Sequence, residues 1–223
     1  MATTESRVGR VVISGRELFI CDNLVDPALV AGIGNGLKTM YFVRKEKSRP
    51  DVPGQAASAD INPALLTEDP FFLRLRAIAE KMFPGEVLRD IRAYINSAVY
   101  GDSYYVHRDS PEGSNDVTVL YYANLIWQPD WGGETLFYND DNDAVLAVSP
   151  RPGRLVVSRA AFCIAEPCRR GAATRSVLPS PTTWVRAVPR AHKKGGAFAP
   201  PFLFEPNSGP APPHARKRIR GGG

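Results

Sequence analysis

Residues 91–159 contain a series of short β-rich runs separated by turn sequences, and this pattern constrains the fold more than any other feature. The runs are rich in β-branched and aromatic residues: IRAYINSAVYG, SYYVHRD, DVTVLYYANL, GGETLFYN, AVLAVSP and GRLVVS. The segments SPEGSND, QPDWGG and PRPG between them are typical of turns. The pattern predicts a mainly β fold with flanking α-helices, in which two sheets form a jelly roll.

The first 90 residues are expected to supply the flanking helices. Residues 10–23 alternate well enough for one or two short strands with a glycine turn between them. A helix over 26–40 is expected because Asp26 can cap it and a proline follows. A second helix, ending at FPGE, is predicted from apolar residues at helical spacing: Phe71 or Phe72, Leu75, Ile78 and Met82. The polar segment 44–62 is predicted to be a loop that borders a binding site.

The composition of the chain changes near Arg159. Residues 160–223 carry 11 Lys and Arg against 2 acidic residues, and they hold half of the 20 prolines. The remaining 159 residues hold 17 basic and 21 acidic residues, so their net charge is −4, and the +9 of the tail brings the total to +5. A composition rich in Pro, Gly and Arg buries too little apolar surface to offset the entropy of ordering. We therefore expect one domain over 1–159, with helices in 1–90 and the β core in 91–159, and a disordered tail over 160–223.

The chain carries no sequence signal for secretion or membrane insertion. No stretch approaches the roughly 20 apolar residues that span a bilayer, and the N-terminal segment MATTESRVGR is polar. The cysteines Cys21, Cys163 and Cys168 are too few for a disulfide framework, and they lack the CxxC spacing of a zinc site. These features favour a cytoplasmic protein without a structural zinc ion.

His107 and Asp109 lie two positions apart in SYYVHRD. In an extended strand, residues i and i+2 point to the same face, so both side chains can reach one point. An imidazole and a carboxylate that converge in this way supply two of the three ligands of an iron site with two histidines and one carboxylate. Taken alone, a histidine and an aspartate at this spacing are more typical of the surface of a strand than of a metal site.

Three longer stretches, YINSAVYGDSYYVHRDS, TVLYYANLIWQPDWGGETLFY and SPRPGRLVV, resemble the iron(II)/2-oxoglutarate-dependent dioxygenases, in the bacterial branch near the prolyl hydroxylases. The likeness covers residues 91–159, and the downstream WGGET favours a metal site over a surface pair. The resemblance implies a double-stranded β-helix that uses iron(II), 2-oxoglutarate and dioxygen. It also implies that His107 and Asp109 are metal ligands, that Tyr104 contacts the cofactor, and that residues 100–102 line the approach.

The pattern of this family requires a second histidine on the strand after PGRLVV and, shortly afterwards, an arginine for the distal carboxylate of 2-oxoglutarate. The chain reads SRAAFCIAEPCRRGAATRSVLPSPT there and contains no histidine. Of the other histidines, His192 lies 83 residues after Asp109 among basic residues, and His214 lies still further along. Neighbouring cations disfavour metal binding at His192. The C-terminal core strands of the jelly roll are therefore expected to be missing or replaced.

A shift of reading frame at or just before Ala160 would explain the missing histidine. When the coding bases after Arg159 are read two positions later, permitted codons can encode GILHRGTVPSRGCYEIRFTLAYN. This peptide has the expected histidine, arginine and closing strand in order. Any codons for Phe162–Cys163 give leucine in that frame, and any codons for Cys163–Ile164 give histidine or tyrosine. The basic run HARKRIRGGG would then be an accident of frame. The coding DNA tests this hypothesis, which fails if no single-base change restores that frame.

The sequence therefore predicts an iron(II)- and 2-oxoglutarate-dependent hydroxylase of a small molecule or of an amino-acid or peptidyl side chain. We expect weak or no turnover, because the distal histidine and the arginine are missing. The alternative is a non-catalytic binding protein whose basic tail engages nucleic acid or an acidic partner, with an affinity that falls steeply with salt. No membrane partner is expected, and nucleic acid is the less favoured partner.

Overall fold

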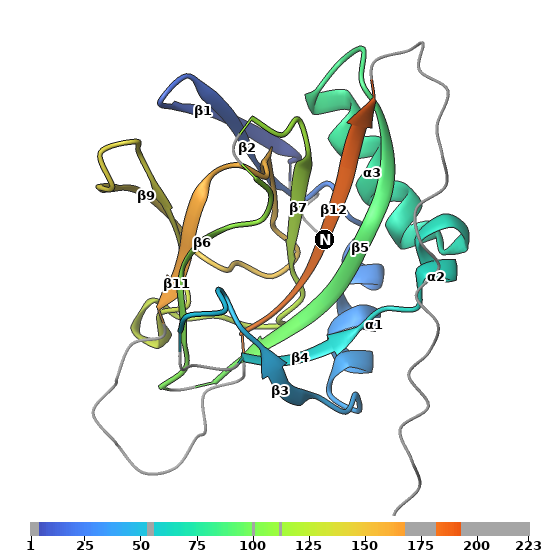
Figure 1. The fold of residues 1–223 in the computed structure, drawn as a ribbon. Helices are drawn as coiled ribbons and strands as arrows, with labels where there is room; N and C mark the ends of the chain where they lie inside the picture. The colour runs from blue at the N-terminus through green and yellow to red at the C-terminus, as the bar shows by residue number, and fades with distance from the viewer. Residues whose placement is uncertain (1–4, 53–55, 100, 112, 168–181, 193–223) are drawn as a thin grey trace, which may run out of the picture.

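The computed structural model describes residues 5–52, 56–99, 101–111, 113–167 and 182–192, which form a sandwich of two antiparallel sheets (Figure 1). The larger sheet has the order β1-β2-β10-β7-β12-β5-β4-β3, and the smaller sheet has the order β6-β11-β8-β9. The strands of the larger sheet are β1 Arg7–Ile13, β2 Arg16–Asp22, β3 Val43–Glu46, β4 Ala56–Asp60, β5 Val87–Ala98, β7 Val117–Tyr122, β10 Leu155–Arg159 and β12 Thr182–His192. Those of the smaller sheet are β6 Ser103–Arg108, β8 Thr135–Tyr138, β9 Ala144–Val148 and β11 Cys163–Pro167. This architecture confirms the predicted jelly roll.

Alternation along the strands divides the interior of the protein into two layers. In β7, Val119 and Tyr121 belong to the core under the helices, whereas Leu120 and Tyr122 belong to the core between the sheets. All six residues of β7 are buried, as expected for a strand that is covered on both faces. The larger sheet thus separates two apolar layers, and the candidate site borders the layer between the sheets.

In the described part of the chain, three α-helices pack on the outer face of the larger sheet (Figure 1). Helix α1, Pro27–Leu37, begins after Asp26, whose carboxylate accepts a hydrogen bond of 2.7 Å from the Ala28 amide. Helix α3, Pro70–Met82, buries one apolar face: Phe71, Leu75, Ile78 and Ala79. Both helices were predicted, whereas the short helix α2, Pro63–Glu68, was not, because six residues are too few to show helical periodicity. None of the described helices is long and apolar enough to cross a bilayer.

The expected separation of helices in residues 1–90 from a β core in residues 91–159 needs correction. Strands β1 to β4 come from the first part and join the same sheet as β5, β7 and β10. The expected loop 44–62 contains most of β3 and all of β4, and β4 pairs directly with β5. Strand β3 lies at the sheet edge and is largely exposed, so its polar composition hides the period that identifies a half-buried strand. A short 3-10 helix, η1 Pro129–Trp131, forms the predicted turn before β8.

Two segments of the expected disordered tail are strands in the structure. Strand β11 lies between β6 and β8, and β12 lies inside the larger sheet between β5 and β7. Without β12, both neighbouring strands would present open backbone edges, and backbone hydrogen bonds can form with almost any sequence. Pro189 lies at a register shift of β12, where its missing N–H is tolerated. The rest of the predicted tail, 168–181 and 193–223, lies outside the described residues.

Asp22 and Arg154 connect β2 to the segment before β10. Arg154 donates from Nε and Nη2 to the two carboxylate oxygens at 2.7 and 2.8 Å. This hydrogen bonding holds the pKa of Asp22 below its usual value. We predict that Asp22→Asn lowers the free energy of unfolding at pH 7 by about 1 kcal/mol.

The difference between the wild type and Asp22→Asn should depend on pH. Because folding lowers the pKa of Asp22, its contribution is fully present above the unfolded value of about 4 and is lost as the pH falls through the folded value. Urea unfolding at pH 7 and at pH 3 measures the difference, with the exposed Asp141→Asn as a control. An equal difference at both pH values would contradict the assignment.

Candidate metal centre

His107 and Asp109 converge at the end of β6. Nε2 of His107 lies 3.5 Å from Oδ1 of Asp109, and both side chains are largely buried. The extended backbone of β6 explains the convergence, because alternate residues project from the same face. The structure therefore brings together the two metal ligands that the sequence predicted.

Two hydrogen bonds decide which atoms of this pair face each other. Nδ1 of His107 lies 2.8 Å from the carbonyl oxygen of Tyr105, which can only accept, so Nδ1 carries a proton, and in the neutral ring Nε2 carries the lone pair. Thr118 on β7 donates from its hydroxyl to Oδ2 of Asp109 at 2.7 Å. Bonds of this kind orient metal ligands in proteins. They leave Nε2 and Oδ1 directed toward a common position.

Main-chain contacts fix the strand that carries the pair. The amides of Asp109 and Ser110 donate to the carbonyl oxygen of Ala160 at 3.0 and 3.2 Å. Arg49, in the segment after β3, donates from Nη1 to the Val106 carbonyl oxygen at 2.7 Å. Segments far apart in the sequence therefore hold the end of β6 in place before any ligand binds.

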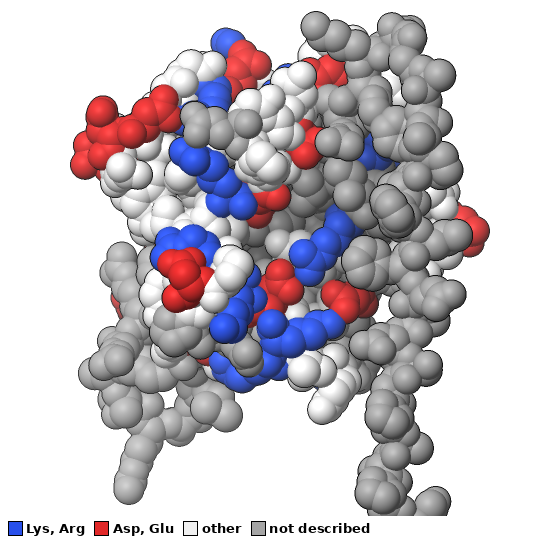
Figure 2. Space-filling model, in the orientation of Figure 1, with Lys and Arg blue, Asp and Glu red and all other residues white. Residues whose placement is uncertain are grey.

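A cavity of about 220 Å³ opens beside His107 and Asp109. Figure 2 shows Lys and Arg side chains, interspersed with Asp and Glu, around the hollow between the sheets on this face. Tyr104, which the resemblance assigns to cofactor binding, is buried and lines this cavity. Residues from three segments form the walls: Glu46, Lys47 and Ser48; Arg92, Tyr94 and Asn96; Tyr104, His107, Arg108 and Asp109.

The turn that was expected to line the approach has another role where it is described. Asp102 accepts hydrogen bonds from Nη1 and Nη2 of Arg44 at 2.8 and 3.2 Å and from the Val99 amide at 2.9 Å. The carboxylate raises the pKa of Arg44. Neither Gly101 nor Asp102 lines the cavity, so this turn anchors β3 instead. Tyr100 lies outside the described residues.

The described residues do not complete a set of three metal ligands. No group of three His, Cys, Asp or Glu side chains comes together in that part of the chain. The register of β11 places Ile164 directly opposite His107, and directly opposed residues of antiparallel strands share one face. Cys163 is opposite Arg108 and so belongs to the other face. The residues present therefore fit a divalent cation as a pair of ligands, with an isoleucine beside them.

Strand register places the backbone of His192 away from the described residues that line this cavity. Its backbone pairs with Val87, at the far end of β5 from Asn96. Five residues of extended strand, roughly 17 Å, separate Val87 from Arg92, the nearest described residue of β5 that lines the cavity. His214 lies outside the described residues.

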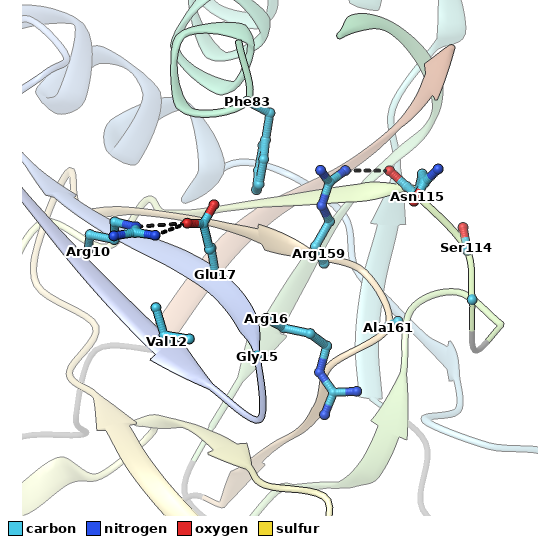
Figure 3. Close-up of a pocket in the computed structure, with 11 residues that line it drawn as sticks. Arg10, Val12, Gly15, Arg16, Glu17, Phe83, Ser114, Asn115, Arg159 and Ala161 are labelled. Atoms are coloured by element: carbon cyan, nitrogen blue, oxygen red, sulfur yellow. Dashed lines mark hydrogen bonds and ion pairs between the residues drawn. The ribbon is translucent and has the colours of Figure 1, made fainter. Parts of the chain in front are cut away.

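A larger cavity of about 460 Å³ lies elsewhere, beside the β1–β2 hairpin (Figure 3). Arg10 forms an ion pair with Glu17 there, and Arg159 donates to the Asn115 carbonyl oxygen at 3.0 Å beneath Phe83. Each arginine that lines this cavity is paired with a carboxylate: Arg10 with Glu17, Arg16 with Asp140 and Arg159 with Glu86. The lining contains no histidine or cysteine, so the smaller cavity is the one with metal-binding chemistry.

Residues 95–185 match the family model described as the 2OG-Fe(II) oxygenase superfamily, and this range includes β6, β11 and part of β12. Over these residues the chain is similar to this superfamily. The cofactors predicted for it, iron(II), 2-oxoglutarate and dioxygen, are those of the superfamily. Neither the family nor the fold supports the alternative of a non-catalytic protein that binds through a basic tail.

Solved structures of similar fold include several oxygenases. A prolyl-4-hydroxylase from Pseudomonas putida has a TM-score of 0.58 at 18% identity, covering 78% of this chain and 92% of its own. An oxidoreductase of the 2OG-Fe(II) oxygenase family from Burkholderia pseudomallei has a TM-score of 0.57 at 13% identity, covering 79% and 85%. HygX from Streptomyces hygroscopicus, with nickel and 2-oxoglutarate bound, has a TM-score of 0.52 at 13% identity, covering 78% and 82%. No curated protein matches the sequence.

Several residues of the site are not evident from the sequence. Thr118 and Asn96 lie on strands that are predicted correctly, and the period of two places each on the inner face. No local signal connects them to His107, since they come from the opposite sheet. Ile164 falls in a segment that was assigned to the tail, so its position opposite His107 depends on the pairing of β11 with β6.

Proposed function

We propose that this oxygenase hydroxylates a small molecule or a peptidyl side chain, with iron(II) held by His107 and Asp109. The observation that carries the proposal is the convergence of Nε2 and Oδ1 at 3.5 Å, oriented by the Tyr105 carbonyl and the Thr118 hydroxyl. Two atoms at this separation can both contact one cation at the usual distance of roughly 2.0–2.2 Å.

Hydrogen bonds with Tyr105 and Thr118 orient the two side chains that would bind the metal. Iron(II) with 2-oxoglutarate and dioxygen supplies the oxidising power for hydroxylation. The Tyr105 carbonyl fixes the tautomer of His107, and the Thr118 hydroxyl donates to Oδ2 of Asp109 and so orients that carboxylate. With Ile164 in place of a third ligand, we expect weak metal binding and weak turnover.

The proposed substrate is a small molecule or a peptidyl side chain, because the similar structures include examples of both. A prolyl hydroxylase from Trichoplax adhaerens was solved with a peptide fragment, and HygX was solved with hygromycin B. Both classes of substrate are therefore part of the proposal. We also propose a cytoplasmic location, which the low and scattered cysteine content favours.

Calorimetric titration with nickel(II) tests the ligands directly. We expect His107→Ala and Asp109→Ala each to weaken nickel(II) binding at least tenfold, or about 1.4 kcal/mol, because each removes one of two protein ligands. Thr118→Val should weaken it by roughly tenfold, since it removes the bond that orients Asp109. Production of succinate from 2-oxoglutarate should fall in parallel.

Asp51→Asn is the matched control, because Asp51 is an exposed carboxylate in the segment after β3 and pairs with Arg49. It should bind nickel(II) like the wild type. Unchanged affinity in both His107→Ala and Asp109→Ala would refute the metal site, even if the protein retained some other activity.

A further inference from the structure

Strand β6 contains one residue too many for regular pairing with β11. Ile164 is directly opposite His107, and the residue two positions further along β11 is opposite Tyr104, which lies three positions before His107. One residue of β11 is therefore opposite two residues of β6, Tyr105 and Val106, and these two form a β-bulge. The bulge interrupts the alternation of the strand. As a result Tyr104 and His107 both point between the sheets, on the face of Ile164.

The same strand can also pair with the bulge in another place. If the extra residue lay one step nearer Asp109, Val106 would be directly opposite Ile164 and His107 would point to the outer face. This shifted register would place an apolar side chain beside Ile164 in the core between the sheets, instead of an imidazole. Asp109 would stay in place, because its amide donates to the Ala160 carbonyl oxygen at 3.0 Å. The direction of His107 therefore depends on what holds the bulge where it is.

The side chain of Arg49 binds the bulge directly. Its Nη1 donates to the Val106 carbonyl oxygen at 2.7 Å, and a hydrogen bond from a charged group is stronger than one between neutral groups. Its Nε and Nη2 donate to the two carboxylate oxygens of Asp51 at 2.9 and 3.2 Å, which fixes the guanidinium plane. Turning the Val106 side chain to the inner face would also turn its carbonyl to the opposite edge of the strand. The shifted register would therefore break the bond to Arg49.

The segment that carries Arg49 is anchored at both ends. Val52 is 4% exposed, and its amide donates to the Arg49 carbonyl oxygen at 3.4 Å. Lys47 and Ser48, just before Arg49, line the cavity beside the candidate metal centre. Strand β6 lies at the edge of the smaller sheet and pairs only with β11 among the described strands, so a contact from outside the sheet has a large influence on its register.

We propose that Arg49 is a positioning residue, which holds the bulge of β6 at Tyr105 and Val106 and thereby keeps His107 directed toward Asp109. The inference rests on the proposed function in one respect, namely that this pair binds a divalent cation. Molecules in the shifted register lack the histidine ligand. The apparent affinity for the metal therefore falls with the fraction of molecules in the observed register.

Calorimetric titration of the full chain with nickel(II) tests the effect on the site. We expect Arg49→Gln to weaken nickel(II) binding by about tenfold, because losing a hydrogen bond from a charged group allows the shifted register to become populated. Val106→Thr added to Arg49→Gln should restore the affinity to within about threefold of the wild type, since the shifted register would bury the threonine hydroxyl. Arg74→Gln is the matched control, because Arg74 also donates to a main-chain carbonyl oxygen, that of Leu24, but from α3.

NMR spectroscopy measures the register without metal. In the wild type we expect a nuclear Overhauser effect between the His107 ring and the Ile164 methyl groups, because directly opposed residues have Cβ atoms about 4.5–5.5 Å apart. In Arg49→Gln this contact should weaken, and a contact between the methyl groups of Val106 and Ile164 should appear. The Arg49 side chain is 42% exposed, so its replacement is expected to leave the protein folded.

The outcomes separate this inference from the proposed function. Equal nickel(II) affinity in Arg49→Gln and the wild type overturns the inference and leaves the metal site intact. A loss of affinity with an unchanged contact between His107 and Ile164 also overturns it, since Arg49 would then not act through the register. Failure of the added Val106→Thr to restore the affinity has the same meaning. Absence of nickel(II) binding in the wild type overturns the proposed function, and the NMR comparison then decides the role of Arg49 by itself.

Discussion

Ile164→His is expected to raise nickel(II) affinity by roughly a hundredfold, or about 2.7 kcal/mol. Ile164 is directly opposite His107 across β11 and β6, so an imidazole there projects from the same face as His107 and Asp109. The variant would then hold three protein ligands, the number that leaves positions open for 2-oxoglutarate and dioxygen. Succinate production with iron(II) should rise accordingly.

The same variant should be less stable without metal. Ile164 is 4% exposed and packs in the core between the sheets, so replacing it with a polar ring should cost about 1–3 kcal/mol of unfolding free energy. Nickel(II) at a hundred times its dissociation constant should restore about 2.7 kcal/mol. Thermal unfolding with and without nickel(II) measures both effects, and neither depends on catalytic turnover.

Cys163→His is the matched control for this gain. Cys163 is the adjacent residue of β11, but it is opposite Arg108 and belongs to the other face. The Cys163→His variant should leave nickel(II) affinity unchanged. Combining His107→Ala with Ile164→His should abolish the gain in nickel(II) affinity. A gain in Cys163→His as large as in Ile164→His would show that the register of β11 is wrong.

Deletion of residues 182–223 is expected to abolish cooperative unfolding. The deletion removes β12, which pairs with β5 from Thr182 to His192 and with β7 over Trp184–Ala187. At about 0.5–1.5 kcal/mol for each backbone hydrogen bond, the loss is comparable with the whole stability of a domain, about 5–15 kcal/mol. Two open strand edges inside one sheet should also promote aggregation. Circular dichroism during heating and size-exclusion chromatography measure these effects.

Deletion of residues 193–223 alone is the control for this experiment. It removes the basic run HARKRIRGGG but keeps β12. We expect it to unfold cooperatively, within a few degrees of the wild type. If the shorter protein ending at residue 181 also unfolded cooperatively at that temperature, β12 would have no part in the sheet.

The sequence failed to predict β12 because its place in the sheet is not a local property. The segment TTWVRAVPRAH contains a proline and shows no clear period of two. Its position depends on β5 and β7, which are separated from it by more than fifty residues and leave space for one strand between them. Strands pair through backbone N–H and C=O groups, and every residue except proline has both. A pattern of side chains therefore predicts strand pairing poorly.

The sequence by itself determined the convergence of His107 and Asp109, the cap of helix α1 and the buried face of helix α3. Each of these follows from the geometry of a few consecutive residues, because the periods of strands and helices are fixed by backbone stereochemistry. The tertiary structure alone decided that Thr118 orients Asp109, that Arg92 and Asn96 lie across the cavity, and that Ile164 is opposite His107. Those relations depend on sheet order and register, which are set by packing between segments far apart in the chain.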